Sequence, residues 1–271
     1  MSRQVLNDAE CNALLDVRRS SFEFDYWSKH ISDETHLKLI KSSKSPIDYR
    51  LLYDSWLWRK VLQSTLPSVD GRIIELLPGT SLTIPMALES AKFRGELLRL
   101  NDERPMALPQ TVQFKSEWNA GNLADGIAGI QDCELILGNH IIDDLLFALH
   151  YPHREQRATI YADPVACRRA WQGLEIRFAT YMKALVILFE RVVQAMPIDC
   201  QLILRHYPST FALVHRDVAR INLEMAAFDK LTSHFERSKI CEVSVVNDDT
   251  VNVPPGSRFP DSIVTLRKLG C

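Results

Sequence analysis

Hydrophobic and polar positions divide the chain into two parts near residue 68. Before it, apolar residues recur at helical spacing, as in the segment 47–66, IDYRLLYDSWLWRKVLQSTL. After it, short apolar runs alternate with longer segments, which is typical of a parallel sheet with helical crossovers. The pattern predicts a helical N-terminal lid, 1–68, and an α/β domain, 69–271, with a helical insertion at about 154–195.

Seven apolar runs predict the strands of the α/β domain. They lie at 72–76, 95–101, 111–116, 133–138, 199–207, 240–248 and 261–269. The last two are joined by a Pro- and Gly-rich turn, with no helix between them, so we expect them to form an antiparallel hairpin at the sheet edge.

Composition indicates a soluble globular protein. The chain has 271 residues, of which 46% are hydrophobic and 24% charged, and its net charge is −2. This balance gives no argument for a nucleic acid or a membrane as partner, so we expect a small-molecule substrate, and a homodimer stays open. The six cysteines are scattered without zinc spacing, the start is polar, and the longest apolar run covers only 184–189. We therefore expect reduced thiols, no metal and a cytoplasmic location.

The loop after the first predicted strand is a candidate ligand site. It reads Glu75-Leu76-Leu77-Pro78-Gly79-Thr80-Ser81. Gly79 permits a close approach of backbone to ligand, and Thr80 and Ser81 offer hydroxyl or N–H groups at a helix start. The loop matches neither the phosphate-binding GxxxxGK[ST] pattern nor the dinucleotide-binding GxGxxG pattern. A Pro-Gly turn that joins a strand to a helix is the alternative.

Polar and aromatic residues also follow the other parallel strands. Asn101 and Asp102 come about 20 residues after the loop, the spacing of a carboxylate that binds ribose hydroxyls. Trp118 follows the third run and can cover a purine ring. A polar strand end and a core tryptophan are the respective alternatives.

The fourth and fifth strands end in further candidates. Gly138, Asn139 and His140 end the fourth, and Arg205, His206 and Tyr207 end the fifth, where open α/β sheets bind ligands. A hydrogen-bonded structural role is the alternative for His140. Asp143 and Asp144 open the next helix and are explained by its dipole.

The order of these elements resembles that of the class I S-adenosylmethionine-dependent methyltransferases. That family has a Rossmann-like, mostly parallel seven-stranded sheet that ends in an antiparallel hairpin, and its first loop commonly reads E/D-x-G-x-G-x-G. Here Glu75 and Gly79 match, whereas Leu77 and Ser81 replace two glycines. The resemblance implies S-adenosylmethionine as cofactor or substrate. It implies the following contacts: Glu75, Pro78, Gly79, Thr80, Ser81, Asn101, Asp102, Trp118, Gly138 and Asn139.

A narrower resemblance concerns the reaction. The segment ELILGNHIIDDLL, the altered glycine loop and the aromatic N-terminal helices are similar to the bacterial azetidine-2-carboxylate synthases of peptide natural-product pathways. The aromatic residues are Phe22, Phe24, Tyr26, Trp27, Tyr49, Tyr53, Trp56 and Trp58. This resemblance implies that the α-amine of S-adenosylmethionine attacks its own γ-carbon, which gives azetidine-2-carboxylate and methylthioadenosine.

The same resemblance implies four candidate catalytic residues, Asn139, His140, Tyr207 and Tyr26, which position the methionyl tail or desolvate its amine. Two alternatives stay open. One is methyl transfer to a small-molecule acceptor, and the other is a non-catalytic binding protein that kept the fold.

Overall fold

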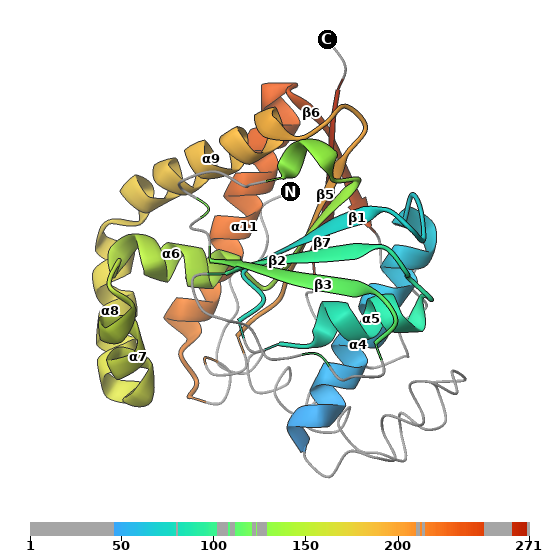
Figure 1. The fold of residues 1–271 in the computed structure, drawn as a ribbon. Helices are drawn as coiled ribbons and strands as arrows, with labels where there is room; N and C mark the ends of the chain where they lie inside the picture. Colours follow the sequence, from blue (N-terminus) through green and yellow to red (C-terminus); the bar gives the residue numbers. More distant parts are fainter. Residues whose placement is uncertain are drawn as a thin grey trace.

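A computed structural model describes residues 46–79, 81–101, 112–120, 129–209, 215–246 and 262–269, together with the single residues 108, 123 and 212. Its centre is a seven-stranded sheet with the order β3-β2-β1-β4-β5-β7-β6 (Figure 1). The first five strands run parallel, whereas β7 is antiparallel to both β5 and β6. This order and these directions are those of the Rossmann-like class I methyltransferase fold, so the predicted fold is confirmed.

The strands agree closely with the apolar runs, with one exception. They are β1 (Arg72–Leu76), β2 (Glu96–Asn101), β3 (Lys115–Ala120), β4 (Leu135–Asn139), β5 (Gln201–His206), β6 (Cys241–Val246) and β7 (Ser262–Lys268). The prediction of the third strand at 111–116 was wrong in position, because the apolar residues of that run precede the strand. Phe114 is buried against Phe93, at 5.6 Å between ring centroids, whereas β3 itself is an exposed edge strand.

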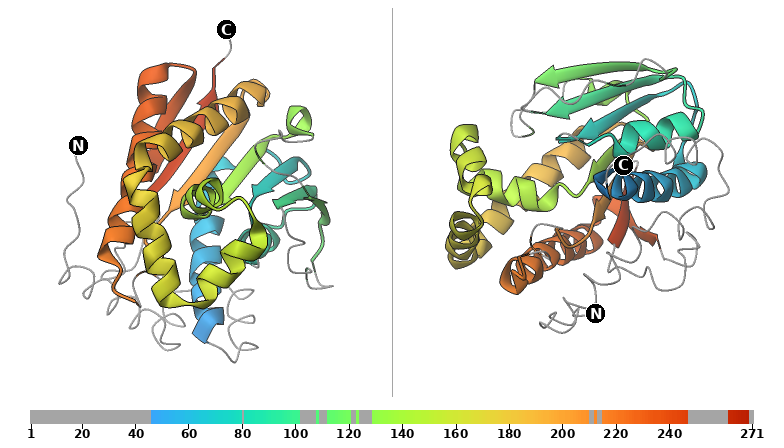
Figure 2. Two further views of the ribbon diagram at one scale, coloured as in Figure 1. Left: turned by 90° about the vertical axis from the view of Figure 1, so that its left-hand side faces the viewer. Right: turned by 90° about the horizontal axis from the view of Figure 1, so that it is seen from below.

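Helices cover both faces of the sheet (Figure 2). They are α4 (Pro46–Thr65), α5 (Thr83–Ser90), the 3-10 turn η2 (Ile130–Asp132), α6 (Ile142–His150), α7 (Arg154–Ala162), α8 (Pro164–Ile176), α9 (Phe178–Ala195) and α11 (Val218–Ser238). Residues 154–195, where a helical insertion was predicted, form α7, α8 and α9. Their status as an insertion into the domain stays a prediction. Among the described helices, none combines the length and the apolar character that crossing a membrane requires.

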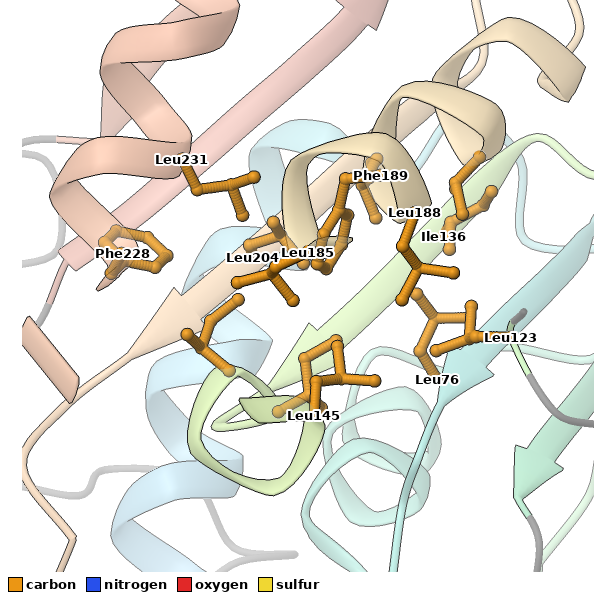
Figure 3. Packing of buried hydrophobic residues seen from close by; sticks show 14 of the residues in the cluster. Leu76, Leu123, Ile136, Leu145, Leu185, Leu188, Phe189, Leu204, Phe228 and Leu231 are labelled. Carbon is orange, nitrogen blue, oxygen red and sulfur yellow. The ribbon is translucent and has the colours of Figure 1, made fainter. Parts of the chain in front are cut away.

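The larger core lies between the sheet and the helices α6, α9 and α11. Figure 3 shows Leu185, Leu188 and Phe189 of α9 pointing toward Ile136 of β4 and Leu204 of β5. The apolar positions of α9 recur every three to four residues, so one side of this helix is buried along its length. The core therefore fixes β4 and β5, the two strands that carry most of the candidate residues.

A second core joins the opposite face of the sheet to α4 and α5. Trp58 and Leu62 of α4 are fully buried in it, as are Ile84 and Leu88 of α5. The helix α4, predicted as part of an N-terminal lid, therefore also belongs to the core. The boundary at residue 68 stays a prediction.

Candidate active site

The candidate residues gather where β1, β2, β4 and β5 end, because the carboxyl ends of parallel strands meet at one edge. Glu75 precedes the end of β1, Asn139 ends β4, and Tyr207 directly follows β5. His140 and Gly79 lie in the loops that leave β4 and β1. The structure therefore brings together residues from separate parts of the chain, as the sequence predicted.

The loop after β1 has two residues with a left-handed backbone, and only one of them is glycine. Leu77 has a φ of +47° and Gly79 a φ of +53°. A left-handed φ is costly for leucine, and it occurs here at a position where the family pattern has glycine. A side chain at Gly79 would meet no atom within 4 Å, so the backbone of this exposed glycine faces open space. That open space is what close approach of a ligand to the loop requires.

A buried arginine holds this loop in place. Arg99 of β2 donates from Nε to the Glu75 carboxylate at 2.8 Å, and from Nη2 to the backbone oxygen of Ser81 at 2.7 Å. The side chains of Arg99 and Glu75 are only 2% and 3% exposed. Burial raises the pKa of Glu75 to about 7, although the charge of Arg99 and its hydrogen bond lower it in part. The Glu75 carboxylate therefore helps to fix the conformation of the loop through Arg99.

Asn139 is the centre of a polar network on the α4 side of the sheet. Its Oδ1 accepts from Nε1 of Trp58 at 2.9 Å and from Nη1 of Arg205 at 3.3 Å. Arg205 in turn donates from Nη2 to Asp54 at 2.9 Å. Trp58 and Asp54 come from α4, so the N-terminal helix reaches the carboxyl ends of β4 and β5.

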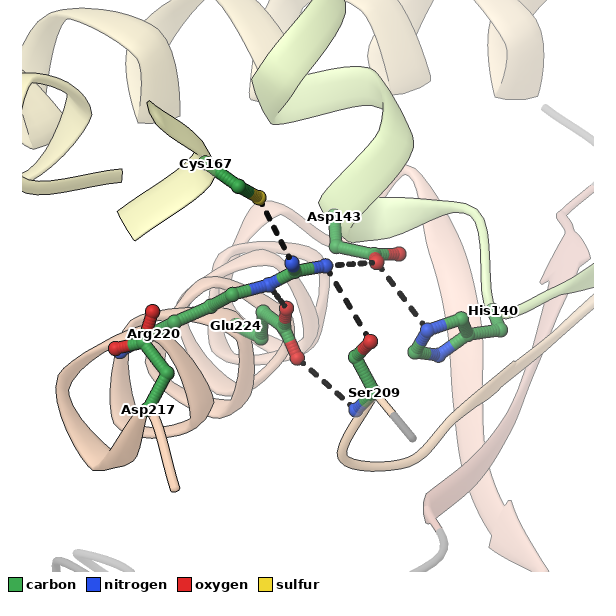
Figure 4. A network of polar contacts seen from close by, with 7 residues as sticks. All are labelled: His140, Asp143, Cys167, Ser209, Asp217, Arg220 and Glu224. Atoms are coloured by element: carbon green, nitrogen blue, oxygen red, sulfur yellow. Dashed lines mark hydrogen bonds and ion pairs between the residues drawn. The ribbon is translucent and has the colours of Figure 1, made fainter. Parts of the chain in front are cut away.

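His140 belongs to a second network, on the side of α6 and α11 (Figure 4). Its Nε2 lies 3.2 Å from Oδ2 of Asp143, and the same oxygen lies 3.4 Å from Nη2 of Arg220. Arg220 also donates to Glu224 and to the Ser209 hydroxyl, the latter at 3.3 Å. His140 has a φ of +57°, so it is the second non-glycine residue with a left-handed backbone at the candidate site, after Leu77.

These charges shift the carboxyl groups in opposite directions. Burial alone would raise the pKa of Asp143, but the charges of His140 and Arg220 and the hydrogen bond from His140 hold it well below its usual range. Burial raises the pKa of Glu224 to about 7, which the charge of Arg220 offsets only in part. Asp143 therefore stays ionised. Besides the interaction with the helix dipole that was predicted for it, its carboxylate forms ion pairs with His140 and Arg220.

Aromatic rings stack around His140. Its ring lies 4.3 Å from that of Tyr207 and 5.2 Å from that of His206, with both pairs nearly parallel. The guanidinium of Arg205 lies 4.5 Å from the Tyr207 ring centroid. Tyr207 is buried, so its ring supports His140. A direct catalytic role for Tyr207 stays a prediction.

His140, Asp143 and His206 bring two imidazole nitrogens and one carboxylate oxygen within 4.8 Å of one another, and atoms of these types can bind a metal ion. Two features of the geometry disfavour a metal ion there. The imidazole planes are stacked within 11° of parallel, so their in-plane lone pairs do not converge on one point. The Arg220 guanidinium already neutralises the Asp143 oxygen that a cation would need. The contacts therefore fit hydrogen bonding better than metal coordination.

The remaining predicted residues have different outcomes. Tyr26, Thr80, Asp102 and the side chain of Asn101 lie outside the described part of the structure. Trp118 is 42% exposed in the middle of β3, and Pro78 and Ser81 lie in the β1 loop. A side chain at Gly138 would come within 2.7 Å of Leu204, so packing alone explains that glycine. Ligand contacts at these positions stay predictions.

Sequence reasoning missed several charged residues of the site. Arg99 lies within a buried strand, and Arg220 and Glu224 lie on the inner side of α11. An arginine among apolar strand residues, as in LLRLN, was the available signal, because buried arginines need partners. Nothing in the sequence identified the partner of each.

Comparison with known proteins finds similarity at the level of structure only. The sequence matches no protein-family model and no curated protein. The plantazolicin methyltransferase BpumL, solved with a pentazolic desmethylPZN analog and SAH, is 6% identical, with a TM-score of 0.49 over 97% of this chain and 100% of that chain. The methyltransferase domain of bacterial CtHen1 is 12% identical, with a TM-score of 0.45 over 79% of this chain and 98% of that chain. Human N-acetylserotonin methyltransferase, solved with SAM, is 11% identical, with a TM-score of 0.41 over 96% of this chain and 67% of that chain. At such low identity the fold assignment rests on the order and directions of the strands.

Proposed function

We propose that the protein is an S-adenosylmethionine-dependent enzyme that acts on a small molecule, with methyl transfer to an acceptor as its reaction. One spatial arrangement carries this proposal. The loop after β1, in which Leu77 and Gly79 have a left-handed backbone, leaves the same edge of the sheet as Asn139 and His140 at the end of the neighbouring strand β4. Two of the similar solved proteins named above, BpumL and human N-acetylserotonin methyltransferase, were solved with SAH and with SAM, which agrees with the proposal.

The residues present fit this cofactor. Open space beside Gly79 leaves room for a ligand against the loop, which Arg99 holds in shape. Asn101 and Asp102 at the end of β2 are proposed to hold ribose hydroxyls. When bound, the cofactor supplies a carbon activated by an adjacent sulfonium. The chain must then position a nucleophile and exclude water.

We propose that His140, held by Asp143, takes up the proton that the nucleophile loses. Asp143 is held ionised and accepts from Nε2 of His140, which fixes the tautomer and orientation of the imidazole. The Tyr207 and His206 rings hold the imidazole from its faces. A proton can therefore be bound on His140 beside a permanent negative charge.

Cyclisation of the cofactor to azetidine-2-carboxylate is the second candidate. It is favoured by the position of Asn139 and His140 as consecutive residues at one strand end, where both can meet one amino-acid tail. This reaction needs no acceptor. Desolvation at the site lowers the pKa of an amine, which favours its nucleophilic form.

Two measurements test these proposals together. Calorimetric titration with S-adenosylmethionine and S-adenosylhomocysteine should show binding to the wild type. Gly79→Asn, which tolerates a left-handed backbone, should fold normally and lose binding. The control Gly173→Ala adds a Cβ on α8 that comes no nearer than 3.4 Å to His150 Nε2, so it should bind normally. Absence of binding to the wild type would overturn both candidate reactions.

Product analysis then separates the reactions. Incubation with S-adenosylmethionine alone should leave it unchanged if the enzyme is a methyltransferase, and S-adenosylhomocysteine should form only when a small-molecule acceptor is added. Methylthioadenosine and azetidine-2-carboxylate formed without an acceptor would establish cyclisation instead. Binding without turnover under either condition would indicate a non-catalytic binding protein.

A further inference from the structure

We propose that Asn139 is a fixed hydrogen-bond donor that recognises the carboxylate of the bound amino-acid tail, and that Trp58 and Arg205 are the positioning residues that fix it. This inference rests on the proposed function, because it names the part of the ligand that Asn139 meets. It follows from the hydrogen bonds that the Asn139 carboxamide makes within the protein.

The orientation of the Asn139 carboxamide is determined by its two partners. Trp58 Nε1 lies 2.9 Å from Oδ1, and Arg205 Nη1 lies 3.3 Å from the same atom. The indole and the guanidinium can donate but cannot accept. The atom that faces both must therefore be oxygen, which settles the usual ambiguity between the oxygen and nitrogen of an asparagine side chain. The Nδ2 group then lies on the other side of the carboxamide.

The surroundings keep the carboxamide from turning over. Trp58 is fully buried in α4, and Arg205 is 1% exposed in β5. Arg205 is itself held by Asp54 of α4 at 2.9 Å. Turning the carboxamide would set the Nδ2 donor against the donors of Trp58 and Arg205, and the loss of a hydrogen bond by a buried group costs about 1–3 kcal/mol.

The donor and acceptor atoms of the Asn139 carboxamide decide which ligand group fits. Its Oδ1 already accepts from Trp58 and Arg205. The group through which Asn139 can bind a ligand at the end of β4 is therefore the Nδ2 donor. An ammonium group, which can only donate, has no partner in Nδ2, whereas a carboxylate oxygen does.

Substitution of Asn139 by aspartate gives a test with a defined sign. Aspartate keeps an oxygen for Trp58 and Arg205, so Asn139→Asp should fold with an unchanged or higher melting temperature. It replaces the Nδ2 donor by a second acceptor. The affinity for S-adenosylhomocysteine should fall roughly 10- to 100-fold, the range for one charge-assisted hydrogen bond.

Methylthioadenosine distinguishes loss of this contact from general damage, since it lacks the amino-acid tail. Its affinity for Asn139→Asp should stay within about twofold of the wild-type value. The variant Trp58→Phe keeps an aromatic ring but removes the donor, so it should lower the affinity for S-adenosylhomocysteine and spare that for methylthioadenosine. The control Gln172→Glu makes the same amide-to-carboxylate change at an exposed position of α8 and should alter neither affinity.

Three outcomes would overturn the inference while leaving the proposed function in place. They are unchanged or tighter binding of S-adenosylhomocysteine to Asn139→Asp, equal weakening of both ligands by that variant, and an equal effect of Trp58→Phe on both ligands. Failure of the wild type to bind S-adenosylhomocysteine would instead contradict the proposed function itself.

Discussion

Glu75 of β1 and Arg99 of β2 are direct neighbours in the parallel register and form an ion pair that is almost fully buried. Arg99 also reaches the backbone oxygen of Ser81, so one guanidinium joins the strand end to the far side of the loop. The loop lacks two of the glycines of the family pattern, and this clamp helps to hold the conformation that those glycines would permit.

Arg99→Lys should weaken both the loop and ligand binding. Lysine keeps the charge but cannot bond Glu75 and Ser81 at once in the geometry of a guanidinium. We expect the free energy of unfolding to fall by about 1–2 kcal/mol, and the affinity for S-adenosylhomocysteine to fall with it. Urea unfolding and calorimetry measure the two effects, with the exposed Arg94→Lys as control. Unchanged affinity in Arg99→Lys would separate the clamp from the ligand site.

The raised pKa of Glu75 predicts a dependence of stability on pH. The folded carboxyl has a pKa of about 7 against an ordinary value of 4.5, so between these values the folded state binds a proton that the unfolded state releases. Its contribution to stability is complete below pH 4.5 and is lost as the pH rises through 7, by at most about 3 kcal/mol. Glu75→Gln cannot titrate. The stability difference between wild type and variant should therefore shrink from pH 5 to pH 8, as measured by urea unfolding, and a constant difference would contradict the raised pKa.

The left-handed backbone of Leu77 predicts an inverted order of two substitutions. At an ordinary position, glycine is less stable than alanine by about 0.5–1 kcal/mol. At a φ of +47° alanine carries the strain that glycine avoids, so Leu77→Gly should be more stable than Leu77→Ala by about 1 kcal/mol. Thermal and urea unfolding of both variants measure the difference. The same pair at Val69, which is exposed and has no positive φ, should show the ordinary order.

The buried network around Arg220 predicts strong coupling with Glu224. Arg220→Met leaves Glu224 buried without its ion-pair partner and leaves Asp143 with His140 alone, which should lower the free energy of unfolding by about 3–5 kcal/mol. Arg220→Met combined with Glu224→Met removes one of the stranded carboxylates, so it should cost less than the sum of the single substitutions. A double-mutant cycle by urea unfolding measures this, with the exposed Arg216→Met as control. Additive effects would show that the two residues act independently.

Cys133 and Cys200 predict a specific response to oxidation. Their Sγ atoms lie 3.6 Å apart and both residues are buried, at the amino ends of β4 and β5. Hydrogen peroxide should convert the two thiols to a disulfide, with the two electrons reducing the peroxide to two waters. Mass spectrometry of unreduced peptides should show the Cys133–Cys200 link, which Cys200→Ser abolishes. Recovery of both cysteines as alkylated thiols would contradict the prediction.

The sequence predicted the sheet well because its buried strands are short apolar runs with clear ends, such as RIIEL, which is β1 itself. It failed at β3 because an edge strand exposed along its length carries no apolar pattern. Phe114, which drew the prediction toward 111–116, is buried before the strand begins.

The sequence predicted that the candidate residues lie at one edge of the sheet, but it did not predict their contacts. Strand ends follow from the runs, so Glu75, Asn139 and His140 could be placed at one edge. The partners Arg99 and Arg220 are distant in sequence and depend on strand register and helix packing, which one sequence does not reveal. The ion pair between Arg99 and Glu75 could therefore be found only from the structure.

The hydrogen bond between Trp58 and Asn139 also provides an optical signal. Of the five tryptophans, Trp58 is fully buried and its indole N–H points to the residue proposed to meet the ligand. Indole fluorescence responds to the polarity and hydrogen bonding around the ring. Titration with S-adenosylhomocysteine followed by emission should therefore report binding at the end of β4 without any added label, and the part of the change that disappears in Trp58→Phe comes from that one indole.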